Sequence, residues 1–542
     1  MSPALQPEDE CLIAAVTALL NNRSYENAKQ LLDGRIAKGL STADPNDVLL
    51  LARIAGLLVD IGSEGHIEAA IKAGLALHED HRAHLIGLFT LASIEYNLGN
   101  AKSSLAELHT PNHFVTPGLA DHDLLLAAKN HYWVALKAHH QDDTFAHKLR
   151  TNLGNALRKS GRITEALTAY DDVIDSDPSF VMAHFHRALS LLVLERLSGT
   201  RTTSLLWQAA NEYEIAANAS DARPQIRAVA STMREYVVKR LAKRGKTLEQ
   251  LQRDSQQPQS EVRNHSEYRQ FTLEHHLGLS EHSLYCRCNG ARRDDLMIAT
   301  KTTPLVGDCV PRLEFVLNRL KAEFGTARLL YYQAVHDQSW DLHEHEITYA
   351  ELFEGEQISV RTELLRTSFR LCLGILDKIA LGVCELYDVA DPAEKVYFES
   401  FWRPKATKGK ASTRWDTLVA KSENPGLVAL YSQASDVQSQ GEWSVFKTWR
   451  NDLEHRFLIL TDDLSREDIL HAREGTFGTR CIARAEFTKR VLSLLQFTRS
   501  AIFNFTYCAR HETRARSDKP STTLTLQHKY PEPLSARYRR KR

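Results

Sequence analysis

The sequence predicts an all-α protein in which an N-terminal array of helical hairpins precedes a C-terminal antiparallel helical bundle. Over residues 1–240, apolar residues recur at intervals of three and four, as the buried stripe of a helix requires, and strand signals are scarce. A periodic unit within this region and a polar segment after it support the division. The predicted parts are the array, a polar linker, the bundle domain and a basic tail, over residues 1–242, 243–270, 271–510 and 511–542.

The periodic unit, His147–Phe180, has small and turn-forming residues where two packed helices need them. Gly154 and Ala166 are small enough for antiparallel helices to approach closely. Gly161 permits the turn between them, and Pro178 stops the second helix. The unit resembles a tetratricopeptide repeat, and the matching positions are Leu153, Gly154, Leu157, Gly161, Ala166, Tyr170 and Pro178.

Less regular copies of this pattern precede it, at Tyr25–Leu32, at Gly65 with Ala70, and at Leu91–Leu105. Such hairpins bury their faces only by stacking, so we expect about four to six of them in a curved solenoid, capped by Leu205–Leu241. The resemblance implies that the concave face holds a protein or peptide, which is the predicted partner of the array. A purely structural scaffold is the alternative.

The composition changes over residues 243–270 to mostly Gln, Ser, Arg and Glu, which is typical of a polar linker. Beyond it, long amphipathic segments predict the helices of an antiparallel bundle. They are Val310–Val335, Val360–Tyr387, Trp443–Thr461 and Ile482–Arg510. The third of these segments carries the polar residues on which the functional prediction depends.

The segment Trp443–Thr461 is predicted to be a helix with two distinct faces. Its apolar residues recur at spacings of three and four, which places them on one core-facing stripe. They are Phe446, Trp449, Leu453, Phe457 and Leu460. Asn451 and His455 lie one turn apart on the opposite side, and Arg450 lies between the two faces. The helix therefore presents a polar trio away from its own core, for which a solvated face without function is the alternative.

This trio resembles the Arg-x4–6-His signature of HEPN-domain ribonucleases, in which a polar residue often follows the Arg. Here Asn451 follows Arg450, and four residues separate Arg450 from His455. Other Arg-to-His pairs of similar spacing lack the Asn and the apolar stripe; they are Arg269 with His275 and Arg466 with His471.

A second resemblance to the same family lies in the run Leu376–Ile379, which looks like a helix that packs beside the motif helix in the larger HEPN proteins. The likeness covers the chain from near Phe271 to Arg510. It implies an endoribonuclease similar to the effectors of prokaryotic defence and toxin systems, here regulated by the array.

The expected chemistry needs no metal and no cofactor, because RNA carries its own nucleophile, the 2′-hydroxyl beside each phosphate. His455 is the expected acid or base, since histidine transfers protons near neutral pH. Arg450 would hold the phosphate oxygens as negative charge accumulates, and Asn451 would orient the phosphate or the histidine. The resemblance implies products with a 2′,3′-cyclic phosphate and a 5′-hydroxyl.

The residues after His455 bear on regulation and assembly. HEPN toxins that a partner enzyme inactivates by nucleotidylation have a Tyr two residues after the His, whereas this chain has Phe457, on the predicted buried stripe. Regulation is therefore expected from the array. Leu458 and Ile459 lie off that stripe on either side of His455, which predicts that they form a homodimer interface. Two facing motif helices would supply two histidines, an arrangement that HEPN nucleases commonly use.

Basic residues gather locally, although the chain has 68 Lys and Arg against 68 Asp and Glu and so gives no overall argument for nucleic-acid binding. A candidate RNA-binding segment bordered by Trp402 and Trp415 contains Arg403, Lys405, Lys408, Lys410 and Arg414. The tail from residue 511 to residue 542 is also basic, and a solubilising tail is the alternative there. Basic residues interleaved with aromatic ones can hold phosphates while bases stack.

Other functions find less support. The chain lacks an apolar run of the roughly 18 residues that span a membrane and lacks a signal-peptide pattern, which predicts a cytoplasmic protein without a membrane partner. Cys286 and Cys288 lack the usual zinc-site spacing, and a polar loop is the preferred explanation for His336, His343 and His345. Two alternatives stay open: a non-enzymatic protein whose bundle binds nucleotide or RNA, and a zinc enzyme that uses this histidine cluster.

Overall fold

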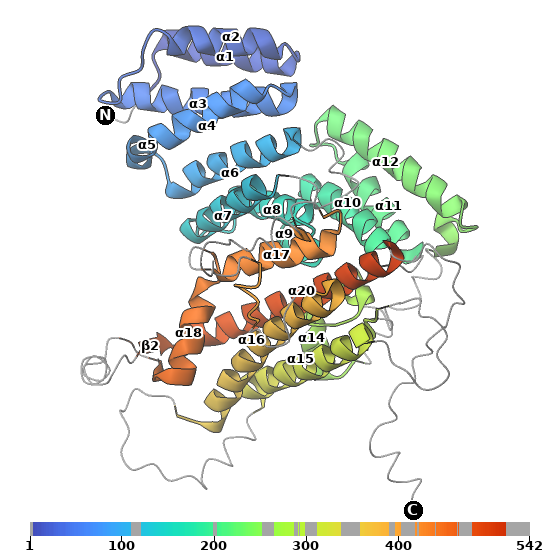
Figure 1. The fold of residues 1–542 in the computed structure, drawn as a ribbon. Helices are drawn as coiled ribbons and strands as arrows, with labels where there is room; N and C mark the ends of the chain where they lie inside the picture. Colours follow the sequence, from blue (N-terminus) through green and yellow to red (C-terminus); the bar gives the residue numbers. More distant parts are fainter. Residues whose placement is uncertain are drawn as a thin grey trace, which may run out of the picture.

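The structure, a computed structural model, describes residues 4–109, 121–198, 203–251, 265–286, 291, 293–298, 312–337, 358–389, 396–402, 418–419, 422–438, 441–462, 464 and 480–515. Helices dominate these residues, and the strands among them form a two-stranded sheet, which confirms the predicted all-α class. Figure 1 shows the N-terminal helices stacked in layers beside a group of long C-terminal helices. None of the described helices is long and apolar enough to cross a membrane.

The N-terminal half is a stack of helices that pack in sequential pairs: α1 with α2, α3 with α4, α6 with α7, α8 with α9 and α10 with α11. The short α5 precedes α6, and α12 covers α11. The bounds are α1 Pro7–Asn21, α2 Tyr25–Ile36, α3 Pro45–Gly65, α4 Glu68–Asp80, α5 Arg82–Leu88, α6 Leu91–Leu108, α7 His122–Ala138, α8 Thr144–Lys159, α9 Ile163–Ser176, α10 Val181–Leu197, α11 Thr203–Asn218 and α12 Pro224–Ala242.

The pair α8 and α9 has the geometry predicted for residues 147–180. A Cβ on Gly154 would lie 2.6 Å from the ring of Tyr170, so a larger residue would separate the two helices. Gly161 turns the chain between them with φ of +79°, a conformation that glycine adopts readily. The same close packing recurs one pair earlier, where a Cβ on Gly99 would lie 2.7 Å from Tyr132.

The C-terminal half is built around the long helices α15, α16 and α20, which pack against one another. They correspond to three of the predicted helices. A further helix, α17, was not predicted; it packs against α20, and every residue in it except Ser435 is buried. The bounds are α14 Glu267–Glu274, the 3₁₀ helix η3 Glu281–Leu284, α15 Arg312–His336, α16 Val360–Tyr387, α17 Pro425–Val437, α18 Ser444–His455, β1 Leu458–Thr461, β2 Arg480–Ala483 and α20 Arg484–Ala515.

The last helical pairs of the array share a hydrophobic core with the C-terminal half. A single cluster of buried residues runs from Ile163 on α9, through α10, α11 and α12, into α15, α16, α17 and α20 as far as Ala509. The interior of the C-terminal bundle is thus continuous with that of the last helical pairs. The predicted domain boundaries within residues 243–270 stay a prediction, but the parts on either side are packed together.

The predicted helix Trp443–Thr461 is wrong in its last third. Helix α18 ends at His455, Arg456 is extended with φ of −144°, and residues Leu458–Thr461 form strand β1, parallel to β2 with Leu458 opposite Arg480. The helical spacing of Phe457 and Leu460 was coincidental, because a short apolar run fits a buried strand equally well. The motif helix is therefore a short helix beside α16 and the sheet, rather than a full member of the bundle (Figure 1).

Candidate active site

Helix α18 places Asn451 and His455 on its exposed face, one turn apart. Side chains at this spacing have Cβ atoms roughly 5–6 Å apart, so both can contact one phosphate group. Neither side chain hydrogen-bonds to another residue within the described part of the chain. The structure thus brings these two predicted residues together in solvent.

Arg450 lies at the edge of this face, where α18 meets α16. Its Nη1 is 3.1 Å from Oδ2 of Asp377, and the other oxygen of this carboxylate, Oδ1, accepts a hydrogen bond from the backbone N–H of Phe398. Burial raises the pKa of Asp377 above its usual value, although the Phe398 amide and Arg450 act in the opposite direction. Arg450 is half-buried. Its guanidinium has five N–H donors, and among the described residues the ion pair with Asp377 uses only part of them, which leaves donors for a phosphate.

Asp377 belongs to the run Leu376–Ile379, so this contact confirms that the run lies beside the motif helix. Two further residues on the same face of α16 were missed. Arg366 donates to the carbonyl of Leu458 at 2.6 Å, and Arg370 donates to the carbonyl of Leu453 at 2.9 Å. They hold the end of α18 and the start of β1.

A spacing signal could have revealed these arginines. Positions 366, 370 and 377 are separated by four and seven residues, which places them on one helical face. A second feature that sequence reasoning missed is Asp452, a buried residue beside Asn451 that accepts a hydrogen bond from Arg480 Nε at 2.6 Å. This bond ties α18 to the first residue of β2. Contacts with α16 and with β2 thus hold α18 in place.

The prediction that Leu458 and Ile459 are exposed beside His455 is wrong. Both are buried within the chain, because they belong to strand β1 instead of continuing the helix. The reason for assigning them to a dimer interface is therefore lost. The opposite correction applies to Phe457, which was expected on the buried stripe but is 65% exposed. An aromatic ring therefore lies in solvent two residues from His455.

Several predicted residues lie outside the part that the structure describes. They are Arg403, Lys405, Lys408, Lys410 and Arg414, together with Cys288, His343 and His345. His336 is described, and its ring stacks on Tyr332 with centroids 4.9 Å apart. Over the described residues, no group of His, Cys, Asp or Glu is placed to hold a metal ion.

Comparison with known proteins gives a family match in this region. Residues 306–512 match the family model described as LA2681-like HEPN, a range that contains α15 through β2, most of α20, and all three residues of the motif. No curated protein matches the chain. The match does not extend to the array, whose likeness to tetratricopeptide repeats stays a prediction. The C-terminal half of the chain is thus similar to the LA2681-like HEPN family, which supports a HEPN domain there.

Proposed function

We propose that the protein is a metal-independent endoribonuclease whose active site is the exposed end of α18. The observation that carries this proposal is the pair Asn451 and His455, facing solvent beside Arg450 in a segment that matches a HEPN family. HEPN domains are commonly ribonucleases, and a role as an effector in a prokaryotic defence or toxin system belongs to the same proposal.

In the proposed reaction the 2′-oxygen bonds to phosphorus while the bond from phosphorus to the 5′-oxygen breaks. A base takes the 2′-hydroxyl proton, and an acid gives a proton to the departing 5′-oxygen. His455 performs one of these transfers, Arg450 stabilises the charge on the phosphate oxygens, and Asn451 orients the phosphate. The products are a 2′,3′-cyclic phosphate and a 5′-hydroxyl.

One His455 per chain supplies one proton-transferring group, so a homodimer that brings two copies of α18 together stays part of the proposal. The surface it would use is the open face of α18 instead of Leu458 and Ile459, which are buried. RNA would be held by exposed groups around His455, among them Arg456 and Phe457, and by the basic segment Arg403–Arg414.

The test is cleavage of an end-labelled RNA by the full chain and its variants. His455→Ala and Arg450→Ala should each lower the rate by at least about 10²-fold, and the double variant should lose little more, because residues that act as a unit are not additive. His140→Ala, which removes an exposed histidine from the array, is the matched control and should cleave normally. Cleavage should persist with a chelator, and DNA should stay intact.

Full activity in His455→Ala would place the reaction at other residues and overturn the proposed mechanism. Cleavage that a chelator stops would favour the alternative of a metal enzyme, whereas a wild-type chain that binds RNA without cleaving it would favour the non-enzymatic binding protein.

We further propose that the array binds its protein or peptide trigger in a polar groove. A cavity of about 430 Å³ is lined by residues of α3, α6, α8 and α10, and a second of about 210 Å³ shares Val59, Asp60, Asn100 and Asn152 with it. Amide side chains line both cavities: Asn97, Asn100, Asn152 and Asn155. Amides both donate and accept hydrogen bonds, as the backbone of an extended peptide requires.

Filling the groove tests this assignment. Gly56 lines the larger cavity, and a Cβ there would meet nothing within 4 Å, so Gly56→Trp should fill the space without disturbing the helix. In cells expressing the chain, RNA ends and growth should differ from wild type in this variant. Gly34→Trp, another open position outside the groove, should behave as wild type. If both variants behave as wild type, the groove is not the sensor.

A further inference from the structure

One face of helix α7 in the array contacts the turn that leads into the motif helix. Lys129, Trp133 and Lys137 are spaced four residues apart and therefore lie on the same side of α7. The ring of Trp133 meets that of Trp443 edge-on, with centroids 5.9 Å apart. Lys137 Nζ lies 2.6 Å from Oε2 of Glu442. The array thus holds the residues that immediately precede α18.

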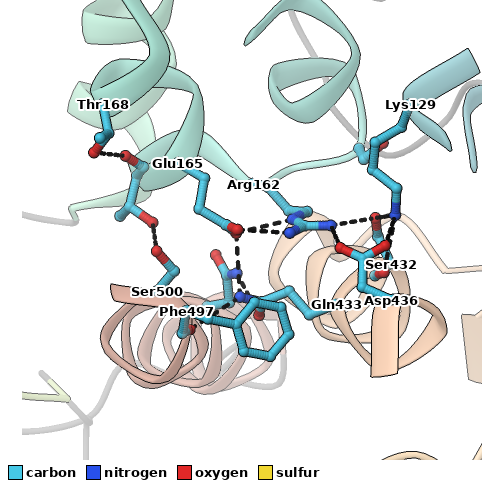
Figure 2. Close-up of polar contacts among 12 residues, drawn as sticks. Lys129, Arg162, Glu165, Thr168, Ser432, Gln433, Asp436, Phe497 and Ser500 are labelled. Atoms are coloured by element: carbon cyan, nitrogen blue, oxygen red, sulfur yellow. Dashed lines mark hydrogen bonds and ion pairs between the residues drawn. The ribbon is translucent and has the colours of Figure 1, made fainter. Parts of the chain in front are cut away.

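The third contact of this face is a buried ion pair between Lys129 Nζ and the carboxylate of Asp436 on α17, shown in Figure 2. Arg162, from the turn between α8 and α9, binds the other oxygen of Asp436 at 2.6 Å. All three side chains are 0% exposed. Burial lowers the pKa of Lys129 to about 8, although Asp436 opposes this shift. A carboxylate so deeply buried needs its cationic partners, and the array supplies both.

Asp436 in turn fixes the first turn of the motif helix. Its backbone carbonyl accepts a hydrogen bond from the N–H of Trp443 at 2.7 Å. The ring of Trp443 stacks on Phe446 of α18, with centroids 5.2 Å apart and planes 2° from parallel. Arg490 of α20 lies over the same Trp443 ring. The start of α18 is therefore placed by residues that α7 contacts directly.

Another face of α7 borders the groove. Tyr132 lines the smaller cavity, and its hydroxyl donates to Asn100 Oδ1 at 2.8 Å. Asn152 donates to the same oxygen at 2.9 Å, which joins α6, α7 and α8 in one hydrogen-bonded group. Helix α7 therefore contacts the proposed trigger site through Tyr132 and the turn before α18 through the next residue, Trp133.

We propose that Lys129, Trp133 and Lys137 are positioning residues for the nuclease site, and that α7 transmits the state of the groove to α18. The array is then part of the catalytic apparatus, and its helical stack sets where Asn451 and His455 lie. The expected effect on catalysis rests on the proposed ribonuclease function, whereas the restraint that α7 places on α18 does not.

Lys137→Glu in the full chain tests the inference. The Lys137 side chain is 51% exposed, so the fold should tolerate the change, whereas its partner Glu442 is 6% exposed and would face a like charge. Hydrogen exchange of the amides in Ser444–His455 should become about fivefold faster, because the first turn of α18 loses a restraint. In the RNA assay kcat should fall by a similar factor with KM unchanged, since the exposed RNA-contacting groups are untouched.

Matched variants separate positioning from general damage. Lys137→Arg keeps the charge and should restore both exchange and kcat. Lys72→Glu makes the same change in an ion pair within α4, where Lys72 is 63% exposed, and should leave α18 unaffected. If Lys137→Glu lowers the helix content, Glu442→Gln removes the same contact more gently and takes its place.

The outcomes distinguish the two proposals. Exchange in α18 that stays at the wild-type rate overturns the coupling through α7, whatever the nuclease result. Faster exchange with unchanged kcat overturns the positioning role in catalysis. A wild-type chain that cleaves no RNA overturns the proposed function, while the exchange measurement still decides whether α7 restrains α18.

Discussion

The two ends of helix α18 differ in how they are held, and the difference separates placement from reaction. At its N-terminal end, Trp443 and Phe446 stack together beneath α7 and α20, next to a carboxylate that is 0% exposed. At its C-terminal end, Asn451 and His455 face solvent. In the proposed nuclease, a buried end would allow Asn451 and His455 to be placed accurately while they stay open to a substrate as large as RNA.

The acidic residues at the two ends show the same contrast. Asp436 is fully buried between Lys129 and Arg162, so water does not compete with these cations for its carboxylate. Asp377 and Arg450 form a partly exposed pair with a single contact of 3.1 Å. Breaking a partly exposed charge pair costs less stability than breaking a fully buried one, so this arginine can turn toward a phosphate more easily. The first pair is thus suited to structure and the second to function.

The largest expected effect comes from breaking the buried pair. Asp436→Ala would leave Lys129 and Arg162 buried with one counter-ion fewer, which typically costs about 3–5 kcal/mol of unfolding free energy. Urea denaturation of the full chain should show a loss of this size. Asp33→Ala, in the exposed pair with Lys29, should cost no more than about 0.5 kcal/mol. Equal losses in the two variants would contradict the contrast between buried and open pairs.

The burial of α17 by the array means that the C-terminal half cannot be separated from the array without exposing this helix. Helix α17 is buried between α9, α20 and the face of α7, and the hydrophobic core continues across the junction. A fragment that begins near residue 260 would expose this helix together with Asp436 stripped of both cations. Point variants in the full chain are therefore the sound way to separate sensing from cleavage.

Local patterns in the sequence were sufficient to predict the hairpin formed by α8 and α9. Gly154, Gly161 and Tyr170 act on neighbours within one hairpin, so spacing alone predicts their contacts. The polar trio at Arg450, Asn451 and His455 was likewise found from a short motif. In both cases the information lies within one or two turns of helix.

Contacts between distant segments could not be predicted in this way. Strand β1 forms because it pairs with β2, and the two are separated by residues 462–479, so its partner is invisible in a short window. Without the strand, Phe457 was placed in the core and Leu458 and Ile459 on the surface. The bond from Lys129 to Asp436 joins residues 307 positions apart, and neither lies in a recognisable motif. Only the fold brings them together.

The smallest expected effect concerns the open end of α18. Phe457 is 65% exposed, and an aromatic ring beside His455 and Arg456 can stack on a base next to the phosphate that the proposed reaction cleaves. Stacking of one base contributes about 1–3 kcal/mol, and we expect the lower end of this range for a ring that is mostly exposed, so Phe457→Ala should raise KM for RNA about five- to tenfold, with kcat nearly unchanged. Phe457→Tyr should keep the ring and the wild-type KM.

Phe315 is the matched control, because it is 68% exposed and belongs to helix α15 instead of the segment that follows α18. Phe315→Ala should leave KM unchanged. An equal rise in both variants would mean that the loss of exposed apolar surface, and not stacking, is being measured. A Phe457→Ala chain that changes from dimer to monomer by light scattering would instead assign this ring to the contact between two copies of α18. The exposed end of α18 would then be covered by a second chain, whereas the buried end is covered by α7 and α20 of the same chain.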